Sequence, residues 1–414
     1  MKRFLSTLLL FIISKFYVTA KILNDSTVIN TFTIQGGYEF GSNAITNNLA
    51  KTYFTNGFIS DPMKDIVSKN LCHTNRFGVD VSTNFQFQHH TDSLFGLKNS
   101  YYKIAFSDIF HLDSKFKKDV FELFFRGNKG YAGKTADLND FELTQIRYQQ
   151  ITFSFGHQFY QGHDLMEWSA GINLNKGQQL INIVAPLASI YTNPYGEFLD
   201  LNVKMEIHSS DSSKTKFTSF NGFGPSINMT FKWTDYKKRE LKLSVENFGF
   251  INWNENSTSV STDTTFRFEG VDISDLFEFK DSVLQTINLD STLVQPYLTN
   301  RNRQSSVTLL PALMKLSYTI PLEKYHLRIE TAIQHLAFAN ALPMIYQNYV
   351  YRINIHHAIG LKVSYGGYSG FHAGINYQLN FNSWMIQVRS DQFDGFLMKN
   401  GTAQGAFVSL SKYF

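Results

Sequence analysis

The chain has 414 residues, of which 15% are aromatic and 17% are charged, and its formal net charge is +4. Soluble globular proteins average roughly 25% charged residues, so this composition argues against an ordinary soluble domain. It also lacks the dense basic cluster of a nucleic-acid-binding protein, and we expect no such partner. The single cysteine, Cys72, excludes an intrachain disulfide and a cysteine-based metal cluster.

The N-terminus has the pattern of a secretory signal peptide. A basic start is followed by an almost wholly apolar stretch over 4–13 and by small residues at 18–20. Lys15 leaves this stretch well short of the ~20 apolar residues that a membrane-spanning helix needs. Residues 1–20 are therefore predicted to be removed, which takes away three cations and no acid and lowers the net charge from +4 to about +1.

From residue 30 onward, apolar and polar residues alternate in segments of about ten residues. In the clearest segment, 199–208, five apolar side chains alternate with Asp, Asn, Lys, Glu and His. A period of two is typical of a strand with one apolar face, and about ten residues let a tilted strand cross a bilayer. The segments are 30–40, 76–90, 100–112, 141–159, 165–175, 199–208, 226–233, 241–246, 260–269, 308–320, 325–337, 355–365, 371–381, 384–391 and 404–414.

These segments predict an all-β fold, namely an antiparallel transmembrane β-barrel formed by residues 21–414 as a single domain. Bacterial single-chain barrels have even strand numbers, so fifteen segments lead us to predict 14 strands, with 16 as the alternative. A soluble sandwich or solenoid is disfavoured because the segments are long and no repeat period is present. A barrel of this width has a lumen that something must fill or use.

Three stretches break the alternation and are predicted to be helical inserts in or capping the lumen, at 43–70, 114–126 and 270–305. In the first, Asp61 before Pro62 has the pattern of an N-cap. Counting strands back from the C-terminus places the third insert at the periplasmic end. This insert is therefore a candidate docking element for a periplasmic or membrane protein partner.

Alternation also predicts which charged side chains face the lumen. Both signs are interleaved, so these groups can pair with one another and hold a plug, or they can form a polar path for a solute. Outward aromatic residues such as Trp233 and Trp253 are expected at the membrane interfaces. The candidate lumen-lining residues are Asp200, Lys204, Glu206, His208, Lys232, Lys242, Glu246, Arg328, Glu330, Lys362 and Arg389.

No catalytic constellation stands out. The run 367–370 is one residue short of a G-x-S-x-G nucleophile elbow and lies between two predicted strands, which favours a turn. The glycine-rich run 127–133 lacks P-loop spacing. Neighbouring histidines such as His89 and His90 point to opposite faces of a strand and cannot share a metal. We expect no enzyme activity, cofactor or metal.

The last segment ends on Phe414 as a strand, which is what a barrel needs to close on its first strand. It resembles the C-terminal recognition strand by which bacterial outer-membrane proteins reach their assembly machinery. Lys412 stands where that signal usually has an aromatic or apolar residue. We predict the outer membrane of a Gram-negative bacterium, with outer-membrane lipid and the barrel-assembly machinery as partners.

Glycine and tryptophan motifs carry a family resemblance. The runs 125–133, 177–192, 222–233 and 245–253 resemble a Bacteroidota family of outer-membrane β-barrels with no assigned function. More distantly, the chain is similar to the long-chain fatty-acid channel (FadL-like) superfamily, which includes barrels associated with type IX secretion. The Asn-Pro-Ala motif expected near the N-terminus of fatty-acid channels is absent; the nearest run is 42–44.

Two functions follow from these observations. The first is passive transport of a small ligand, hydrophobic if the resemblance to fatty-acid channels extends that far. The alternative is a non-conducting structural or accessory barrel of an outer-membrane secretion or assembly complex. A continuous apolar tunnel to a gap between strands favours the first, and a lumen sealed by paired side chains favours the second.

Overall fold

The computed structural model describes residues 30–214, 216–269, 300–398 and 400–414. The predicted signal peptide and the predicted insert up to residue 299 lie outside the described residues. Within the described ranges, no helix combines the length and the apolar character needed to cross a membrane.

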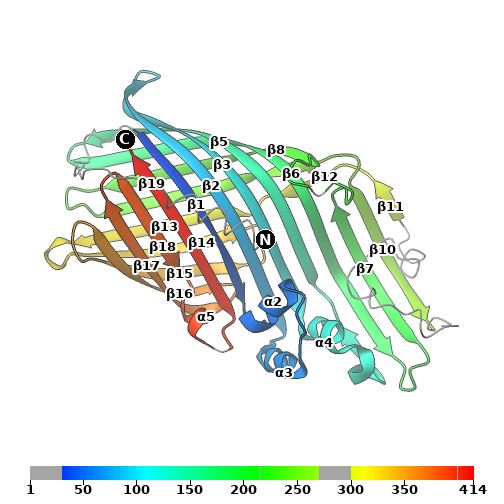
Figure 1. The fold of residues 1–414 in the computed structure, drawn as a ribbon. Coiled ribbons are helices and arrows are strands. Elements are labelled where there is room, and N and C mark those ends of the chain that lie inside the picture. The colour runs from blue at the N-terminus through cyan, green and yellow to red at the C-terminus, as the bar shows by residue number, and fades with distance from the viewer. Residues whose placement is uncertain (1–29, 215, 270–299, 399) are drawn as a thin grey trace, which may run out of the picture.

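In the part of the chain that the structure describes, fourteen strands form a closed antiparallel barrel (Figure 1). The first strand, β1 (Asn30–Ser42), closes the ring by pairing with β19 (Ala403–Tyr413). The predicted all-β, 14-strand barrel is therefore confirmed. The other barrel strands are β2 (Thr74–Leu94), β3 (Leu97–Lys117), β5 (Phe141–Gln161), β6 (Asp164–Thr192), β8 (Gly222–Thr234), β9 (Glu240–Trp253), β13 (Ala312–Leu322), β14 (Leu327–Ala337), β15 (Leu342–Arg352), β16 (His357–Gly367), β17 (Gly370–Phe381) and β18 (Trp384–Ser390).

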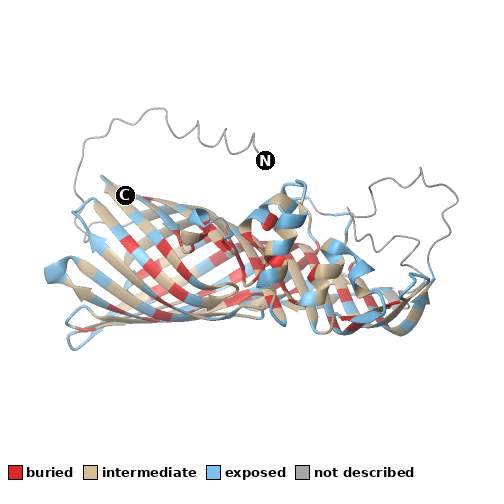
Figure 2. Cartoon of the chain, turned by 90° about the horizontal axis from the view of Figure 1, so that it is seen from below, coloured by how far each residue is buried: buried red, intermediate tan, exposed pale blue. Residues whose placement is uncertain are grey.

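Alternation in the sequence becomes an apolar outer wall and a polar lumen, so that exposed and less exposed residues alternate along the strands (Figure 2). On β1, Phe32 and Ile34 are exposed on the outer face, whereas Gln35 and Glu39 line the lumen. Such an apolar band is what lipid tails require of a barrel. Further exposed members are Phe85, Ile104, Ile151, Phe153, Ile172, Met229, Phe231, Leu243, Leu316, Ile333, Ile345, Ile359, Leu361, Ile375, Val388 and Val408.

The two ends of the barrel differ. Tight turns such as 162–163 and 382–383 lie at the end that carries Phe414. The opposite end carries the long connections 43–73, 118–140 and 391–402, and all helices of four or more residues in the described ranges begin in them. We call it the helical end. Short periplasmic turns and long external connections are usual in outer-membrane barrels.

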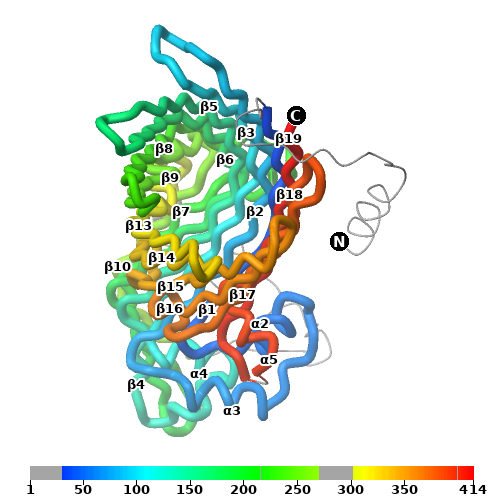
Figure 3. Tube along the Cα trace, turned by 90° about the vertical axis from the view of Figure 1, so that its left-hand side faces the viewer, coloured from blue at the N-terminus to red at the C-terminus, as the bar shows by residue number. Residues whose placement is uncertain are grey.

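Among the described residues, four α-helices lie at the helical end (Figures 1 and 3): α2 (Asn47–Phe54), α3 (Asp61–Asn70), α4 (Lys118–Arg126) and α5 (Asp394–Leu397). The first three fall inside the predicted windows 43–70 and 114–126. Thr46 caps α2 by accepting a hydrogen bond from the Leu49 N–H at 3.3 Å. The N-cap of α3 is Ser60, so the predicted Asp61 is instead its first helical residue.

A branch of the sheet projects beyond the barrel at the helical end (Figure 1). It begins on β6, whose first part, Leu165–Gly177, pairs with β8 inside the ring, while Ile181–Thr192 pairs with β7 (Leu199–Ser209). We call this branch the extension. Its further members are β10 (Thr258–Phe268), β11 (Asn300–Arg303), β4 (Lys134–Asp137) and the 3-10 turn η2 (Asn128–Tyr131), while β12 (Ser306–Leu309) pairs with the end of β9.

The extension corrects part of the strand assignment. Segments 199–208 and 260–269 are strands, but they lie outside the ring, because β6 is long enough to carry a second partner beyond the barrel. The barrel strand β15 was missed, because Pro343 and a register shift between Leu342 and Ile345 hide its alternation. The errors nearly cancel, so the strand total was right although its membership was not.

The extension also corrects the side assigned to the third insert. Residues 270–299 are bordered by the ends of β10 and β11, which belong to the extension at the helical end, opposite Phe414. The count that placed this insert at the periplasmic end was wrong, because it treated β7 and β10 as barrel strands.

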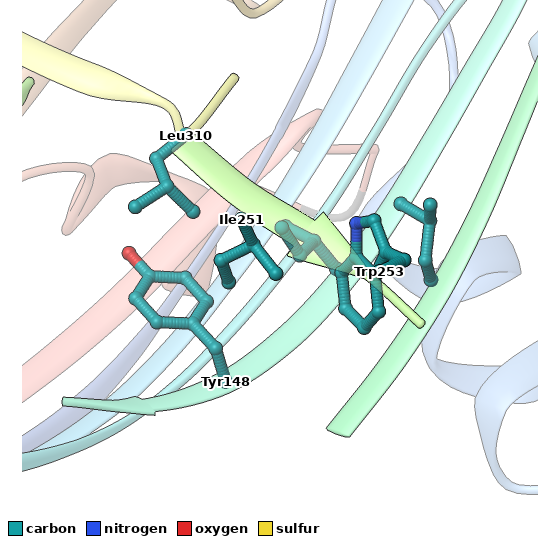
Figure 4. Packing of buried hydrophobic residues seen from close by; sticks show 6 residues of the cluster. Tyr148, Ile251, Trp253 and Leu310 are labelled. Atoms are coloured by element: carbon teal, nitrogen blue, oxygen red, sulfur yellow. The ribbon is translucent and has the colours of Figure 1, made fainter. Parts of the chain in front are cut away.

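An apolar cluster covers the inner face where the barrel meets the extension (Figure 4). Trp253, predicted at the membrane interface, is fully buried in it. The reason is a bulge in β9 near Asn247 (φ +60°), which reverses the faces, so Leu243 points outward whereas Trp253 points inward. The cluster consists of Ile146, Tyr148, Leu180, Ile251, Trp253 and Leu310.

Candidate functional site

The barrel lumen holds a cavity of about 520 Å³. Strands β1, β2, β9 and β13 to β18 contribute to its wall, and so does the turn between β16 and β17. Acidic and basic side chains contribute equally to the lining, so the cavity carries charge of both signs. The acids are Glu39, Asp80, Glu246 and Asp391, and the bases are Lys242, Lys315, Lys362 and Arg389.

Part of one side of the cavity is apolar. Neighbouring strands β13, β14 and β15 bring Leu313, Leu336 and Met344 into its wall, and Leu342 adds to them. The charged groups of β9 lie next to this side, and those of β18 lie across the ring from β9. The cavity is therefore amphipathic.

Two of the four lining cations are held by carboxylates. The Lys362 ammonium lies 2.9 Å from Asp391, and the Lys315 ammonium lies 2.8 Å from Glu330. The ring of Tyr346 lies between them, with its centroid 4.2 Å from Lys362 and 5.2 Å from Lys315. These contacts fix the charges of the β13–β16 wall in one arrangement.

The other two cations and Glu246 are less constrained. Neither Lys242 nor Glu246 has an ion-pair or hydrogen-bond partner among the described residues, although both line the cavity. Arg389 stacks on Phe407, with 4.6 Å between its guanidinium carbon and the ring centroid. Because a charge removed from water is costly unless it is paired, unpaired charges in a cavity wall indicate contact with water or a polar solute.

Tyr368 belongs to the cavity lining at the helical end. It belongs to the turn 368–369 between β16 and β17, which we call the Tyr368 turn. Its side chain rests on two glycines that are register partners on neighbouring strands, with the ring over Gly78 of β2 and Cβ beside Gly41 of β1. A methyl group on Gly78 would lie 2.2 Å from Cε2 of Tyr368, so the ring fits only because Gly78 has no side chain. We call Gly41 and Gly78 the glycine seat.

Asp113 of β3 anchors the turn from across the lumen. Its carboxylate accepts hydrogen bonds from the Tyr368 hydroxyl at 3.3 Å and from the backbone N–H of Asn340, which belongs to the turn between β14 and β15. Burial, and then the nearby Asp113 carboxylate, raise the pKa of Tyr368, so the hydroxyl remains a donor. Asp113, which is only 1% exposed, thus binds both the Tyr368 turn and the turn between β14 and β15 from across the lumen.

The rest of this rim is closed by polar contacts around α5. Gln392 donates a hydrogen bond to Glu39, and the His372 ring lies 3.0 Å from the Asp394 carboxylate. The side-chain amide of Asn47 donates to two backbone carbonyls of the 391–403 connection, each at 3.0 Å. These contacts join α2, α5 and the barrel wall at the helical end.

Comparison with known proteins gives a family. Residues 26–391 match the model described as "Family of unknown function (DUF5723)". The chain belongs to this family. The prediction of a family without an assigned function is therefore confirmed. No curated protein matches the chain.

Several solved structures are similar in architecture. A TodX deltaS2S3 mutant monoaromatic hydrocarbon channel shares 8% identity over 94% of this chain and 91% of its own, with a TM-score of 0.47. The P. putida toluene transporter TodX shares 7% over 95% and 91%, with a TM-score of 0.44. A Pseudomonas aeruginosa FadL homologue shares 8% over 93% and 90%, with a TM-score of 0.43. Identities and TM-scores this low give no information about a ligand of this protein.

The structure separates the predicted lumen residues into three groups. Lys242, Glu246, Lys362 and Arg389 line the cavity. Three others are not part of the cavity lining and form ion pairs: Glu330 with Lys315, Lys232 with Glu167 at 2.6 Å, and Arg328 with Glu240 at 3.7 Å. The prediction was wrong for the residues of β7, which lie in the extension rather than the lumen, namely Asp200, Lys204, Glu206 and His208.

Sequence reasoning missed the residues that make contacts across the lumen at the helical end. Tyr368 was part of a run interpreted only as a turn, and nothing local reveals that its ring reaches Asp113, 255 residues away. The glycine seat carried a weak signal, since a glycine in a strand often marks a close approach. Recognising it required the pairing of Gly41 with Gly78.

Proposed function

We propose that this protein is an outer-membrane barrel of a Gram-negative bacterium that passes a small amphipathic solute passively through its lumen. The observation that carries this proposal is the cavity of about 520 Å³, which is apolar on part of one side and contains charges, those of Lys242 and Glu246, without an ion-pair or hydrogen-bond partner among the described residues. A barrel with a purely structural role has no need of such a space. The chemistry is binding and passage, without a catalytic step.

The two turns that reach across the lumen at the helical end can be displaced without unfolding the barrel. The Tyr368 turn and the 338–341 turn connect neighbouring strands, so displacing them leaves the strand ladders intact. Their cross-lumen contacts are two hydrogen bonds to Asp113 and the packing of one ring on the glycine seat. We infer that this structure is the closed state of the channel and that withdrawal of the Tyr368 turn opens it.

The lining favours an amphipathic solute over a purely hydrophobic one. Charged side chains reach the cavity from β1, β2, β9, β13, β16 and β18, so a wholly apolar molecule would strand several of them without water. A solute with a charged group and a short apolar body matches both Lys242 and the wall formed by Leu313, Leu336 and Met344.

The non-conducting accessory barrel remains the second candidate, and the extension is the observation that favours it. The extension contains β7 and β10, which are not needed to enclose the lumen. The apolar cluster around Trp253 covers the inner face where the extension leaves the barrel. In this alternative the extension and the 270–305 insert dock a protein of a secretion or assembly complex. The barrel itself then transports nothing.

Swelling of proteoliposomes separates the two candidates. Vesicles with the Tyr368→Ala protein are placed in isotonic 6-aminohexanoate, which has two charged ends and an apolar body, or in glucose, a neutral solute of similar size. The transport proposal predicts swelling faster than that of protein-free vesicles, and faster in 6-aminohexanoate than in glucose. Swelling equal to that of protein-free vesicles in both solutes would contradict it.

A further inference from the structure

On the outer wall, the apolar band is interrupted by charged side chains toward the helical end. On β3 and β5 the exposed Ile104, Ile151 and Phe153 give way to an ion pair, in which the Arg147 guanidinium lies 3.0 Å from Asp108. This polar row marks the edge of the apolar band. Beyond it the outer face is apolar again.

Helices α2, α3 and α4 cover this second apolar region. Phe116 of β3 lies on the same face of its strand as Ile104, an even number of residues away without a register shift, and therefore points outward. It packs with Leu49, Val67 and Phe121 of the three helices. The helices thus form a layer on the outside of the wall, next to the apolar band, rather than a plug in the lumen (Figure 1).

This layer exposes aromatic rings on its other side. Tyr53 and Phe54 end α2, Phe58 lies in the following loop, and Phe124 belongs to α4; we call these four residues the aromatic patch. Their exposed fractions are 49%, 55%, 88% and 51%. Tyr53 contacts the rings of Phe54 and Phe124 at centroid distances of 5.8 and 6.3 Å. Tyr53, Phe54 and Phe124 thus form one exposed group of rings across α2 and α4, and Phe58 follows four residues after the end of α2.

We propose that the aromatic patch rests on the headgroup surface of the bilayer that surrounds the barrel. Aromatic side chains are favoured at that depth, where one part of the ring system is apolar and another is wet. The helix layer lies outside the wall and continues from the lipid-facing band across the Asp108–Arg147 row, so its neighbour in a membrane is lipid rather than lumen water. Lys51, exposed one turn before Phe54, adds a cation for lipid phosphate.

Lipid explains the patch better than a protein partner does. The patch continues a lipid-facing band on the same outer face, whereas a docking site for a protein needs no such position. The extension tip provides a contrast, because Tyr195 in the 193–198 connection is also highly exposed (87%) but lies at the far end of β6, beyond the helix layer. Exposure alone therefore does not define the patch.

Spin labels measure this contact directly. The full-length Cys72→Ser protein carries a nitroxide at Phe58→Cys, at Phe85→Cys in the apolar band, or at Tyr195→Cys, in bilayers of phosphatidylethanolamine and phosphatidylglycerol. Relaxation by oxygen, which partitions into lipid, is compared with relaxation by an aqueous nickel chelate. The proposal predicts an intermediate depth at position 58, deep burial at 85 and full aqueous access at 195.

Two results would overturn the proposal. The first is aqueous access at position 58 equal to that at 195 while position 85 is deep, since the label at 85 shows that the barrel is folded and inserted. The second is the same aqueous access in pure lipid combined with protection in native membranes, which would assign the patch to a protein partner. Neither result bears on conduction, so the transport proposal stands or falls separately.

Discussion

Gly78→Ala is the substitution that tests the closed state most sharply. The added methyl group would lie 2.2 Å from Cε2 and 2.5 Å from Cζ of Tyr368, whereas ordinary contacts begin at 3.4 Å, so the ring must withdraw by about 1.2 Å. Its hydroxyl is already 3.3 Å from Asp113, so this withdrawal breaks the hydrogen bond.

The energy of this change can be bounded. Overpacking costs about 1–3 kcal/mol, and a hydrogen bond to a charged group contributes about 1.5–3 kcal/mol. Relaxation of the flexible turn recovers part of this. A net destabilisation of the closed state by about 2 kcal/mol corresponds to an open-to-closed ratio about 30-fold higher.

Single-channel recording of the purified, refolded proteins measures this ratio, and the same wall supplies controls. Gly36→Ala adds a methyl group on the outer face of β1 at ordinary contact distance (3.6 Å), and Gly41→Ala meets Tyr368 and Ser369 at 3.4 Å. The expected open probability is highest for Gly78→Ala, whereas Gly41→Ala, Gly36→Ala and wild type should be alike, because their contacts are at ordinary distances. Equal open probabilities for Gly78→Ala and Gly36→Ala would refute the role of the glycine seat.

Two further predictions concern the lumen charges and the inner apolar cluster. Lys242→Gln removes an unpaired cation from the cavity wall and should shift the reversal potential under a salt gradient toward cation selectivity. Lys204→Gln on β7, in the extension, should leave the reversal potential unchanged. Equal shifts for the two variants would contradict the assignment of Lys242 to the lumen. Trp253→Ala empties the centre of a fully buried cluster and should lower the free energy of unfolding in urea by about 3–5 kcal/mol. Tyr195→Ala, at an exposed site, should change that free energy by less than about 0.5 kcal/mol, and similar losses for both variants would show that the cluster does not hold the barrel together.

Much of the fold could be predicted from the alternation of apolar and polar residues. Side chains of a strand alternate between its two faces, and lipid on one face requires apolar residues there. This is enough for barrel class, strand direction and the inward position of residues such as Lys242 and Glu246. It does not say which strand pairs with which. The branch at β6 depends on one strand being long enough for two partners, so β7 was assigned to the ring.

Other features were hidden for separate physical reasons. A single bulge near Asn247 reverses the faces of β9, and this turned Trp253 from a predicted interface residue into a core residue. The lumen barrier joins side chains from distant parts of the chain, and no local pattern encodes the contact between Tyr368 and Asp113. Alternation identifies faces, whereas the closure of the lumen depends on contacts across the ring.

The most direct test of the proposed function is ion conductance in planar bilayers for the wild type, Tyr368→Ala and Tyr365→Ala. Tyr365 precedes the same turn but lies exposed on the outer face of β16, so it controls for loss of a tyrosine in this hairpin. We expect mostly closed recordings for the wild type and Tyr365→Ala and steady openings for Tyr368→Ala. Silence in all three proteins, each verified as folded and inserted, would contradict the claim that the Tyr368 turn bars a conducting lumen.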